Sequence, residues 1–505
     1  MFRKILIANR GEIAVRIIRA LREMNIRSVA VFSDVDRTAL HVRMADEAEH
    51  IGPAPSSESY LRIDRIIDAA KKHGADAIHP GYGFLSENAD FAVACEAAGI
   101  IFIGPTPGSI RRLGSKTAAR ALAKDARVPT VPGSEEPAKD LEAARRLARE
   151  LVYPVLIKAS AGGGGKGMRR VDKESELDAA IREASSEAER SFRNSEVYIE
   201  KLIDKPRHIE IQIAGDQHGN LVHLGERECS LQRRHQKIVE ECPSPLITQN
   251  PKMRAAMGDA ALRIARAVGY TSLGTVEFLA DIHGDFYFLE VNTRLQVEHP
   301  VTELVTGYDL VRLQLQIAAG EKLPFKQEGV QWRGAALECR ICAEDTENNF
   351  FPSPGKIVQL REPSGPGVRL DSGVYQGWKV PIDYDPLLAK LVVWDENRDS
   401  SIRRMLRALS EYSIAGVETN LAFFREIMDD PLFRKGGLHT GFVADFFARR
   451  SPKPIPPQDL ELAVALAAAA AHSKNGDSNN GQPATGNQKL KTSNWLAEGR
   501  GSFLR

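Results

Sequence analysis

The first hundred residues alternate short apolar runs with longer stretches in which apolar residues recur every three or four positions. The run at 4–8 predicts a buried strand, the stretch at 12–24 an amphipathic helix and the run at 28–32 a second strand. Two more short apolar runs follow before Gly104. Strands that alternate with helices at this spacing are typical of a parallel sheet covered by helices. We therefore expect such a sheet over residues 1–114.

The middle of the chain changes its pattern twice. Helical periodicity over 116–151 is interrupted by a loop at 129–137 that begins and ends with proline. Strand-like alternation then dominates 197–242 and 274–291, for example in Ile209-Glu-Ile-Gln-Ile213. Alternation of this kind predicts a large antiparallel sheet.

The chain changes again near its end. Residues 451–457 are rich in proline, which predicts a stiff extended linker. An Ala/Leu-rich helix is expected at 459–472, and the Asn, Gly, Ser and Lys of 473–493 predict disorder. Trp495 and Phe503 make the last residues candidates for docking elsewhere.

Composition restricts the function classes. The 505 residues are 43% hydrophobic and 27% charged, which is ordinary for a folded enzyme and excludes a disordered or fibrous chain. The 68 Lys and Arg nearly balance the 67 Asp and Glu, so we expect neither nucleic acid nor a membrane as a partner. No apolar stretch reaches the ~18 residues of a membrane helix. Five cysteines, sparse and odd in number, predict no disulfide framework and favour the cytoplasm.

Four consecutive glycines followed by Lys166 and Gly167 are the strongest local signal. Glycine lets backbone N–H groups approach an anion closely. A P-loop is excluded because no Ser or Thr follows Lys166. A dinucleotide fingerprint should open a helix, yet 168–171 has an extended pattern. The remaining interpretations are a lid between two strands that folds over nucleotide phosphates and, as the bland alternative, a solvent-exposed hairpin turn.

Acidic and amide side chains alternate along a second predicted strand. Glu290, Asn292 and Arg294 should share one face, with Leu289, Val291 and Thr293 on the other, toward a core. Residues 275–279 bring Glu277 onto a strand that can pair with this one through the turn at 283–285. Such hard oxygen ligands suit Mg²⁺ or Mn²⁺. The alternative is a solvated Glu290–Arg294 surface pair.

Two further clusters have weaker signals. Arg233, Arg234, His235 and Lys237 crowd positive charge into five positions, which suits an anionic substrate or, equally, a solvated charge run. The pair Cys339 and Cys342 has zinc-like spacing but no second pair. On an extended segment these two sulfurs lie on opposite faces, so they could not bind one metal ion together. We therefore expect both cysteines to have a packing role.

These motifs together resemble the biotin carboxylase family of ATP-grasp ligases over about residues 1–447. The segments that resemble it are Ile7-Ala-Asn-Arg-Gly-Glu-Ile-Ala14, His79-Pro-Gly-Tyr-Gly-Phe-Leu-Ser-Glu87, the glycine run, Gln232-Arg-Arg-His-Gln-Lys237 and residues 290–300. The glycine run and the Glu290 strand are shared with carbamoyl-phosphate synthetases, whereas the first two motifs are more specific to biotin carboxylation.

The resemblance implies an α/β and α+β fold in several parts. They are an N-terminal parallel α/β domain at 1–114, an ATP-grasp domain at 115–330 with a lid at about 131–203, a C-terminal β-rich domain at 331–447 and a tail at 448–505. It also implies the ATP-driven carboxylation of biotin on a carrier protein. Bicarbonate attacks the γ-phosphate of ATP, and the resulting carboxyphosphate breaks down to CO₂ and phosphate. Phosphate then removes the N1 proton of biotin, which attacks CO₂.

The resemblance also implies roles for individual residues. ATP would be contacted by Lys116, Lys158, Met168, Glu200, Lys201, His208, Gln232 and His235, under a loop of Gly163, Gly164, Gly165, Lys166 and Gly167. Two Mg²⁺ or Mn²⁺ ions would be held by Glu277, Glu290 and Asn292. Bicarbonate and biotin would be held by Lys237, Arg294, Gln296, Val297, Glu298 and Arg340. Among these, Glu298 would take the proton of bicarbonate and Arg340 would stabilise the biotin enolate.

Partners are implied in the same way. The chain has no Ala/Val-Met-Lys-Met tetrapeptide for biotin attachment, so biotin should arrive on a separate carboxyl carrier protein. Carboxyltransferase subunits and a homodimer are further expectations. The final acceptor stays open between acetyl-CoA, as in fatty acid biosynthesis, and propionyl-CoA or pyruvate. Competing hypotheses are an NAD oxidoreductase, another ATP-grasp carboxylate or carbamate ligase, and a silent nucleotide-binding subunit.

Overall fold

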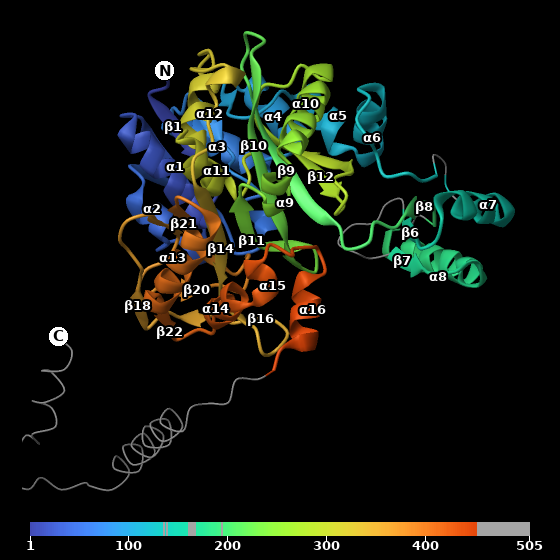
Figure 1. Ribbon diagram of the computed structural model, residues 1–505. Helices are drawn as coiled ribbons and strands as arrows, with labels where there is room; N and C mark the ends of the chain where they lie inside the picture. Colours follow the sequence, from blue (N-terminus) through green and yellow to red (C-terminus); the bar gives the residue numbers. More distant parts are fainter. Residues whose placement is uncertain (135–136, 138–139, 160–167, 193–194, 452–505) are drawn as a thin grey trace, which may run out of the picture. The chain divides into compact units, whose positions relative to one another are not determined.

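The computed structural model describes residues 1–134, 137, 140–159, 168–192 and 195–451 (Figure 1). The glycine run and the linker, helix and tail expected after 451 lie outside the described residues. Residues Met1–Phe447 form one compact unit. In the described part of the chain, no helix has the length and apolarity needed to cross a membrane.

The N-terminal segment forms the predicted parallel sheet. Its strands, in the spatial order β3-β2-β1-β4-β5, are β1 (Lys4–Ile7), β2 (Arg27–Ser33), β3 (Glu47–Gly52), β4 (Ala77–His79) and β5 (Ile101–Phe102). Every neighbouring pair is parallel. The helices of this segment are α1 (Gly11–Glu23), α2 (Leu40–Met44), α3 (Ile63–His73), α4 (Ala89–Ala97) and α5 (Pro107–Gly114).

Helices cover both faces of this sheet because β1 is apolar on both sides. Ile5 and Ile7 pack in the cluster that contains α1, while Leu6 and Ala8 pack in the cluster that contains α3 and α4. A parallel sheet buried on both faces requires such a continuous apolar strand. The polar side chains at the carboxyl ends of β1 and β4 therefore meet at one edge, where sheets of this class place their ligands.

A small three-stranded sheet follows. Its strands, in the order β7-β6-β8, are β6 (Val155–Ala159), β7 (Met168–Val171) and β8 (Val197–Lys201). The helices nearby are α6 (Lys116–Asp125), α7 (Leu141–Leu151) and α8 (Glu174–Phe192), and the last two pack against the sheet. The prediction that 168–171 is extended is confirmed, and Lys158 pairs with Met168 in an antiparallel ladder. The glycine run therefore connects two strands, which excludes the dinucleotide fingerprint. The strand at 197–201 belongs to this sheet and not to the large one.

The predicted large antiparallel sheet is present and has eight strands among the described residues. In spatial order they are β13 (Phe286–Asn292), β12 (Ser272–Ala280), β9 (Arg207–Gly215), β10 (Leu221–Arg233), β11 (Gln236–Cys242), β14 (Ala335–Cys342), β21 (Leu387–Asp395) and β19 (Val368–Ser372). The short strands β15 (Glu344–Asp345) and β16 (Phe351–Pro352), β17 (Gly355–Lys356) and β20 (Lys379–Val380), and β18 (Gln359–Arg361) and β22 (Ser413–Ala415) pair beside it. Because β11 pairs with β14, one sheet continues from the central into the C-terminal segment.

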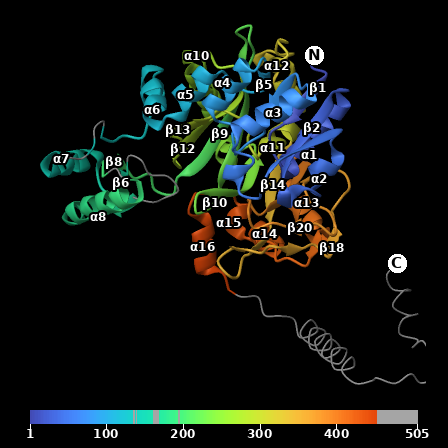
Figure 2. The same ribbon diagram turned by 180° about the vertical axis from the view of Figure 1, so that it is seen from behind.

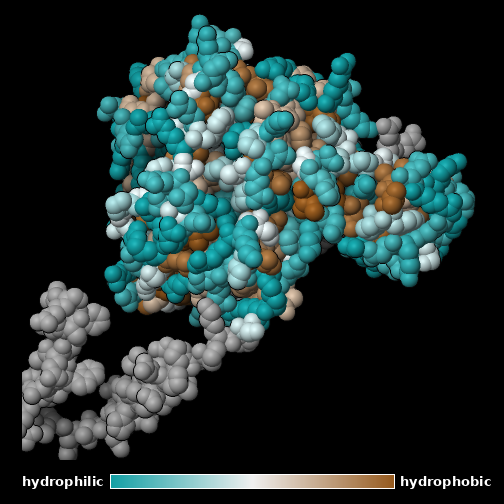
Figure 3. Space-filling view, in the orientation of Figure 1, coloured by the Kyte–Doolittle hydropathy of each residue, from teal (hydrophilic) through white to brown (hydrophobic). Residues whose placement is uncertain are grey.

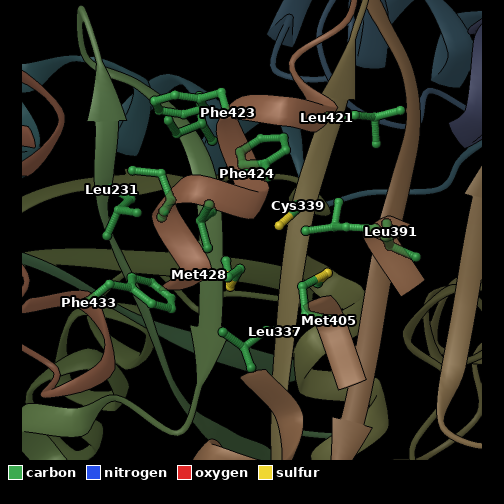
Figure 4. Packing of buried hydrophobic residues seen from close by; sticks show 14 of the residues in the cluster. Leu231, Leu337, Cys339, Leu391, Met405, Leu421, Phe423, Phe424, Met428 and Phe433 are labelled. Carbon is green, nitrogen blue, oxygen red and sulfur yellow. The ribbon is translucent and has the colours of Figure 1, made fainter. Parts of the chain in front are cut away.

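Helices follow or connect these strands (Figure 2). They are α9 (Pro245–Gln249), α10 (Pro251–Ala267), α11 (His299–Thr306), α12 (Leu310–Ala318), α13 (Arg398–Glu411), α14 (Leu421–Asp429), α15 (Pro431–Arg434) and α16 (Phe442–Arg449). Of these helices, α10, α11, α12 and α13 contact the sheet directly. Figure 4 shows the core that α13 and α14 form with β14 and β21. Cys339 is fully buried in this core, which confirms its predicted packing role. Cys342, on the same strand, is buried but lines a cavity, so the predicted packing role is not confirmed for it. On the face shown in Figure 3, hydrophilic residues predominate and apolar residues form small patches.

Candidate active site

The two N-terminal motifs lie side by side at the carboxyl edge of the parallel sheet. Asn9 follows β1, and the loop that begins at Pro80 follows β4, the neighbouring strand. The Asn9 Nδ2 donates to the carbonyl oxygens of Pro80 and Tyr82, both at 2.7 Å. This double hydrogen bond fixes the loop that carries Tyr82 to the end of β1.

The predicted carboxylate pair is also formed. Glu277 on β12 lies directly opposite Glu290 on β13, and the hairpin closes through the predicted turn. A β-bulge follows, because Phe278 pairs with Phe288 and leaves Leu289 without a partner across the ladder. The placement of Val291 in a core is confirmed, whereas that of Leu289 is wrong. The bulge interrupts strict alternation, so Leu289 lines a cavity.

That cavity has a volume of about 1080 Å³ and collects nearly every residue that the sequence assigned to a site. The described residues in its wall include Lys116, Lys158, Met168, Glu200, Lys201, His208, Gln232, His235, Lys237, Glu277, Glu290, Asn292, Arg294, Gln296, Val297 and Arg340. Glu298 is fully buried and lies behind the wall, against two of these residues. Gly163, Gly164, Gly165, Lys166 and Gly167 are outside the described residues.

The Lys237 ammonium is the centre of the site. Its Nζ donates to Glu210 Oε2 at 2.5 Å, Glu277 Oε1 at 2.7 Å and Glu298 Oε1 at 2.8 Å. Burial by itself lowers the pKa of Lys237, but the three carboxylates outweigh it and raise that pKa well above its usual value. One ammonium group is thus shared by three carboxylates. In this geometry the ammonium can exchange a hydrogen bond to a carboxylate for one to an incoming anion.

Glu298 lies between two cations. Arg340 Nη2 donates to Glu298 Oε2 at 3.0 Å, and Arg340 Nε donates to Glu240 Oε1 at 2.6 Å. Burial tends to raise the pKa of Glu298, but Lys237, Arg340 and the buried Arg227 hold it well below its usual range. For Glu240, burial prevails over Arg340 and raises the pKa to about 7. Glu298 is therefore ionised at neutral pH.

The donors around Glu277 and Glu290 differ. Glu277 accepts hydrogen bonds from Lys237, from Asn292 Nδ2 at 2.8 Å and from Gln296 Nε2 at 3.3 Å. No described residue donates to the Glu290 carboxylate, and burial together with the facing Glu277 charge raises its pKa. Lys116 lies near enough to lower this pKa in part, but it forms no hydrogen bond with Glu290 among the described residues. Two opposed carboxylates with an amide oxygen match the ligands of Mg²⁺ or Mn²⁺. The donor set therefore fits a divalent ion.

Arg294 does not form the surface pair with Glu290 that was the alternative interpretation. Its Nη2 donates to Asn292 Oδ1 at 3.0 Å and its Nη1 to Gln296 Oε1 at 2.9 Å. Its Nε donates to Glu87 Oε2 at 2.8 Å. The guanidinium is thus held in one orientation at the cavity wall.

The predicted basic cluster is divided by the hairpin that carries it. Arg234 and His235 form the turn between β10 and β11, with φ of 48° and 66°. Arg233 stacks on Phe350 at 4.2 Å and is not part of the cavity wall, whereas His235 and Lys237 are. The anion-binding prediction is therefore confined to the second half of the cluster.

Sequence reasoning missed a buried polar layer beneath the cavity. Arg227 and Glu210 are fully buried and hydrogen-bonded to each other, and Arg227 Nη1 also donates to Gln212 Oε1 at 2.7 Å. The signal was present in the Ile-Glu-Ile-Gln-Ile alternation of β9, but alternation alone does not show whether the polar positions meet water or a second layer. Both faces of β9 are buried, so Glu210 binds Lys237 and Gln212 binds Arg227 instead of meeting water.

A second buried lysine links the N-terminal segment to the site. Lys390 Nζ donates to the Val297 carbonyl oxygen at 2.9 Å and lies 3.2 Å from Glu12 Oε2. Burial raises the pKa of Glu12 to about 7, even though Lys390 lowers it. A carboxyl with a raised pKa stabilises the fold below its unfolded pKa of 4.5, and this contribution is lost as the pH rises through about 7.

The variant Glu12→Gln should therefore gain stability relative to the unmutated protein as the pH rises. The relative free energy of unfolding should increase by about 3 kcal/mol between about pH 4 and pH 8, at 1.36 kcal/mol per pKa unit. Urea unfolding followed by circular dichroism measures it. Glu303→Gln is the matched control, and its relative free energy of unfolding should change with pH in the opposite direction. Burial raises the Glu303 pKa, but Arg16 and Arg369 outweigh burial and hold the pKa below its usual value. A Glu12→Gln difference that does not change with pH would contradict the assignment.

Comparison with protein families supports the geometry along the whole compact unit. Residues 1–110 match the model of the biotin carboxylase N-terminal domain, and residues 338–445 match that of the biotin carboxylase C-terminal domain. Residues 115–326 match the ATP-binding domain of the carbamoyl-phosphate synthase L chain. Together these models cover most of the chain.

Comparison with individual relatives points to the same family as the domain models. The chain is 53% identical to a pyruvate carboxylase subunit of Methanothermobacter thermautotrophicus, covering 88% of this chain and 90% of that protein. It is 52% identical to biotin carboxylase 1 of Bacillus subtilis, covering 88% and 99%. A structure of the biotin carboxylase domain dimer of Hydrogenobacter thermophilus 2-oxoglutarate carboxylase, with MgADP, ADP and bicarbonate, has a TM-score of 0.82 at 47% identity and covers 88% of this chain and 98% of that one. The chain therefore belongs to the biotin carboxylase family of ATP-dependent ligases.

Proposed function

We propose that the cavity takes ATP, bicarbonate and the biotin of a separate carrier protein, and that this chain catalyses the first half-reaction of a multisubunit biotin-dependent carboxylase. The observation that carries this proposal is the ionised Glu298, held between Lys237 and Arg340 behind the cavity wall. A carboxylate that is ionised at neutral pH and contacts two cations of the cavity wall can accept a proton from an anion bound to the same wall.

The nucleotide end of the site is assigned to side chains that come from α6, from the small sheet and from the segment β9 to β11. Lys158 Nζ lies 3.6 Å from Glu200 Oε2, and Gln232 Nε2 lies 2.6 Å from His208 Nδ1. The proposed ATP contacts are Lys116, Lys158, Met168, Glu200, Lys201, His208, Gln232 and His235, with Gly163 to Gly167 over the phosphates. Glu277, Glu290 and Asn292 would hold Mg²⁺ or Mn²⁺, which neutralises charge on the phosphates during transfer.

The bicarbonate end is assigned to Lys237, Arg294, Gln296 and Val297, with Glu298 as the base. In the free site the ammonium of Lys237 holds the Glu298 pKa low, which makes this carboxylate a weak base. An anion bound to Lys237 and Arg294 shares that positive charge, so the Glu298 pKa rises toward the working pH. Proton transfer is most efficient there. Binding of the substrate thus activates its own base.

Arg340 is assigned to the biotin enolate, because its guanidinium keeps its proton and can stabilise an oxyanion. Arg340→Ala should lower the rate of biotin carboxylation at least ~10-fold more than that of bicarbonate-dependent ATP cleavage, since the loss of one oxyanion donor costs ~10²–10³-fold. Both rates are measured on the same preparation. Equal losses in the two assays would remove this role.

The partners follow from the same proposal. Biotin arrives on a carboxyl carrier protein, carboxyltransferase subunits take the carboxyl group, and the chain forms a homodimer in the cytoplasm, where its five free cysteines stay reduced. The partner subunits determine whether acetyl-CoA, propionyl-CoA or pyruvate is the acceptor. The test is ATP consumption with bicarbonate, with and without free biotin. Biotin should stimulate it and become carboxylated, whereas consumption that ignores biotin would point to another carboxylate ligase.

A further inference from the structure

The last residue of the second N-terminal motif reaches a different part of the molecule. Glu87 follows β4, and its carboxylate contacts the segment after β13, more than two hundred residues later in the chain. Its Oε1 accepts hydrogen bonds from Thr293 N at 2.8 Å and Thr293 Oγ1 at 3.4 Å, and its Oε2 accepts one from Arg294 Nε at 2.8 Å. Glu87 thus fixes the position of the residues that follow β13 and lead to Glu298.

These contacts complete the coordination of the Arg294 guanidinium. Asn292 and Gln296 accept from its two terminal nitrogens, so Glu87 is the acceptor for the remaining Nε. A guanidinium with acceptors on each edge has one orientation, and its pairing with a carboxylate is among the stronger hydrogen bonds. Without Glu87, the Nε edge would face solvent and the arginine could rotate about its long side chain.

We propose that Glu87 is a positioning residue, which acts through Arg294 and the Thr293 backbone to hold the bicarbonate site in its working geometry. This inference rests on the proposed function of Arg294. The Glu87 carboxylate is bound by Thr293 and Arg294, and Arg294 lines the cavity, so Glu87 acts on the substrate through these partners. A displacement of about 1 Å in a reacting group can lower a rate ~10²-fold.

The variant Glu87→Ala should lower kcat/KM for bicarbonate ~10- to 100-fold and leave KM for ATP unchanged. The Glu87 side chain is 39% exposed, so the variant should fold. Glu87→Gln keeps an acceptor for Thr293 N but loses the charged pair, and it should fall between Ala and the unmutated protein. Asp90→Ala is the matched control, since it removes an exposed carboxylate nearby in the chain, in the first turn of α4, that pairs with Arg111 at 3.0 Å.

A double-mutant cycle with Arg294→Ala tests the positioning role of Glu87 separately from the proposed function of Arg294. If Glu87 acts through Arg294, Glu87→Ala should have little further effect on bicarbonate kinetics in the Arg294→Ala background. Additive losses, or a Glu87→Ala protein with the kinetics of Asp90→Ala, would overturn the inference. If Arg294→Ala itself leaves bicarbonate kinetics unchanged, the proposed function of Arg294 fails instead. Thermal unfolding of each variant shows whether a loss comes from the fold.

Discussion

Glu298→Gln should lower bicarbonate-dependent turnover by ~10²- to 10⁴-fold, which is the range for the loss of a positioned general base. The pKa of Glu298 is held well below its usual range, so the substitution removes a full negative charge at neutral pH while it keeps the shape of the side chain. Affinity for MgATP should change little, because Glu298 is fully buried behind the cavity wall. Steady-state ATP cleavage and calorimetric titration with MgATP measure the two effects.

A matched control is available on the next helix. Glu303 on α11 is also buried and paired with arginines, at 3.1 Å from Arg16 and 2.6 Å from Arg369. Neither of these arginines lines the cavity, whereas Lys237 and Arg340, the partners of Glu298, both do. Glu303→Gln should therefore change stability and leave bicarbonate kinetics largely unchanged. If Glu298→Gln and Glu303→Gln had the same turnover, Glu298 could not be the base.

Lys237→Met should destabilise the free protein by about 3–5 kcal/mol, since breaking a buried ion network leaves uncompensated charge. The ammonium binds Glu210, Glu277 and Glu298 at once. Its loss leaves three buried carboxylates with too little positive charge, because in the described part of the chain only Arg227 at Glu210 and Arg340 at Glu298 remain as arginine partners. Divalent ions with ATP should recover part of this stability, because a cation near Glu277 neutralises the same cluster. Denaturant unfolding with and without MgATP measures both effects.

Lys72→Met is the control for Lys237→Met. Lys72 forms an exposed pair with Glu49 at 2.8 Å, and exposed pairs contribute at most about 1 kcal/mol. If Lys237→Met cost no more than this surface substitution, the three carboxylates would not depend on the ammonium. The same result would weaken the proposal that the Lys237 ammonium shifts its hydrogen bond from Glu298 to the bound substrate.

The parts of the site that were predictable from sequence are those set by local pattern. Glu277 and Glu290 were brought together by the hairpin turn between two alternating strands, and the hairpin confirms this. The placement of Leu289 failed because a bulge depends on the partner strand, which alternation along a single strand does not reveal.

The deeper layer was not predictable for a different reason. Whether the polar face of a strand meets water or a second layer is decided by tertiary packing. In β9 that face is buried, and Glu210 therefore became part of the site. The contact of Glu87 with Arg294 depends in the same way on how two distant segments pack, although both motifs were singled out from sequence.

The most direct test of the central claim is a crystal structure with a non-hydrolysable ATP analogue, Mg²⁺ and bicarbonate. We predict the triphosphate in the cavity, divalent ions bound by both Glu277 and Glu290, and bicarbonate between Lys237 and Arg294. A cavity that stays empty at saturating nucleotide, or ions bound away from these two glutamates, would contradict it.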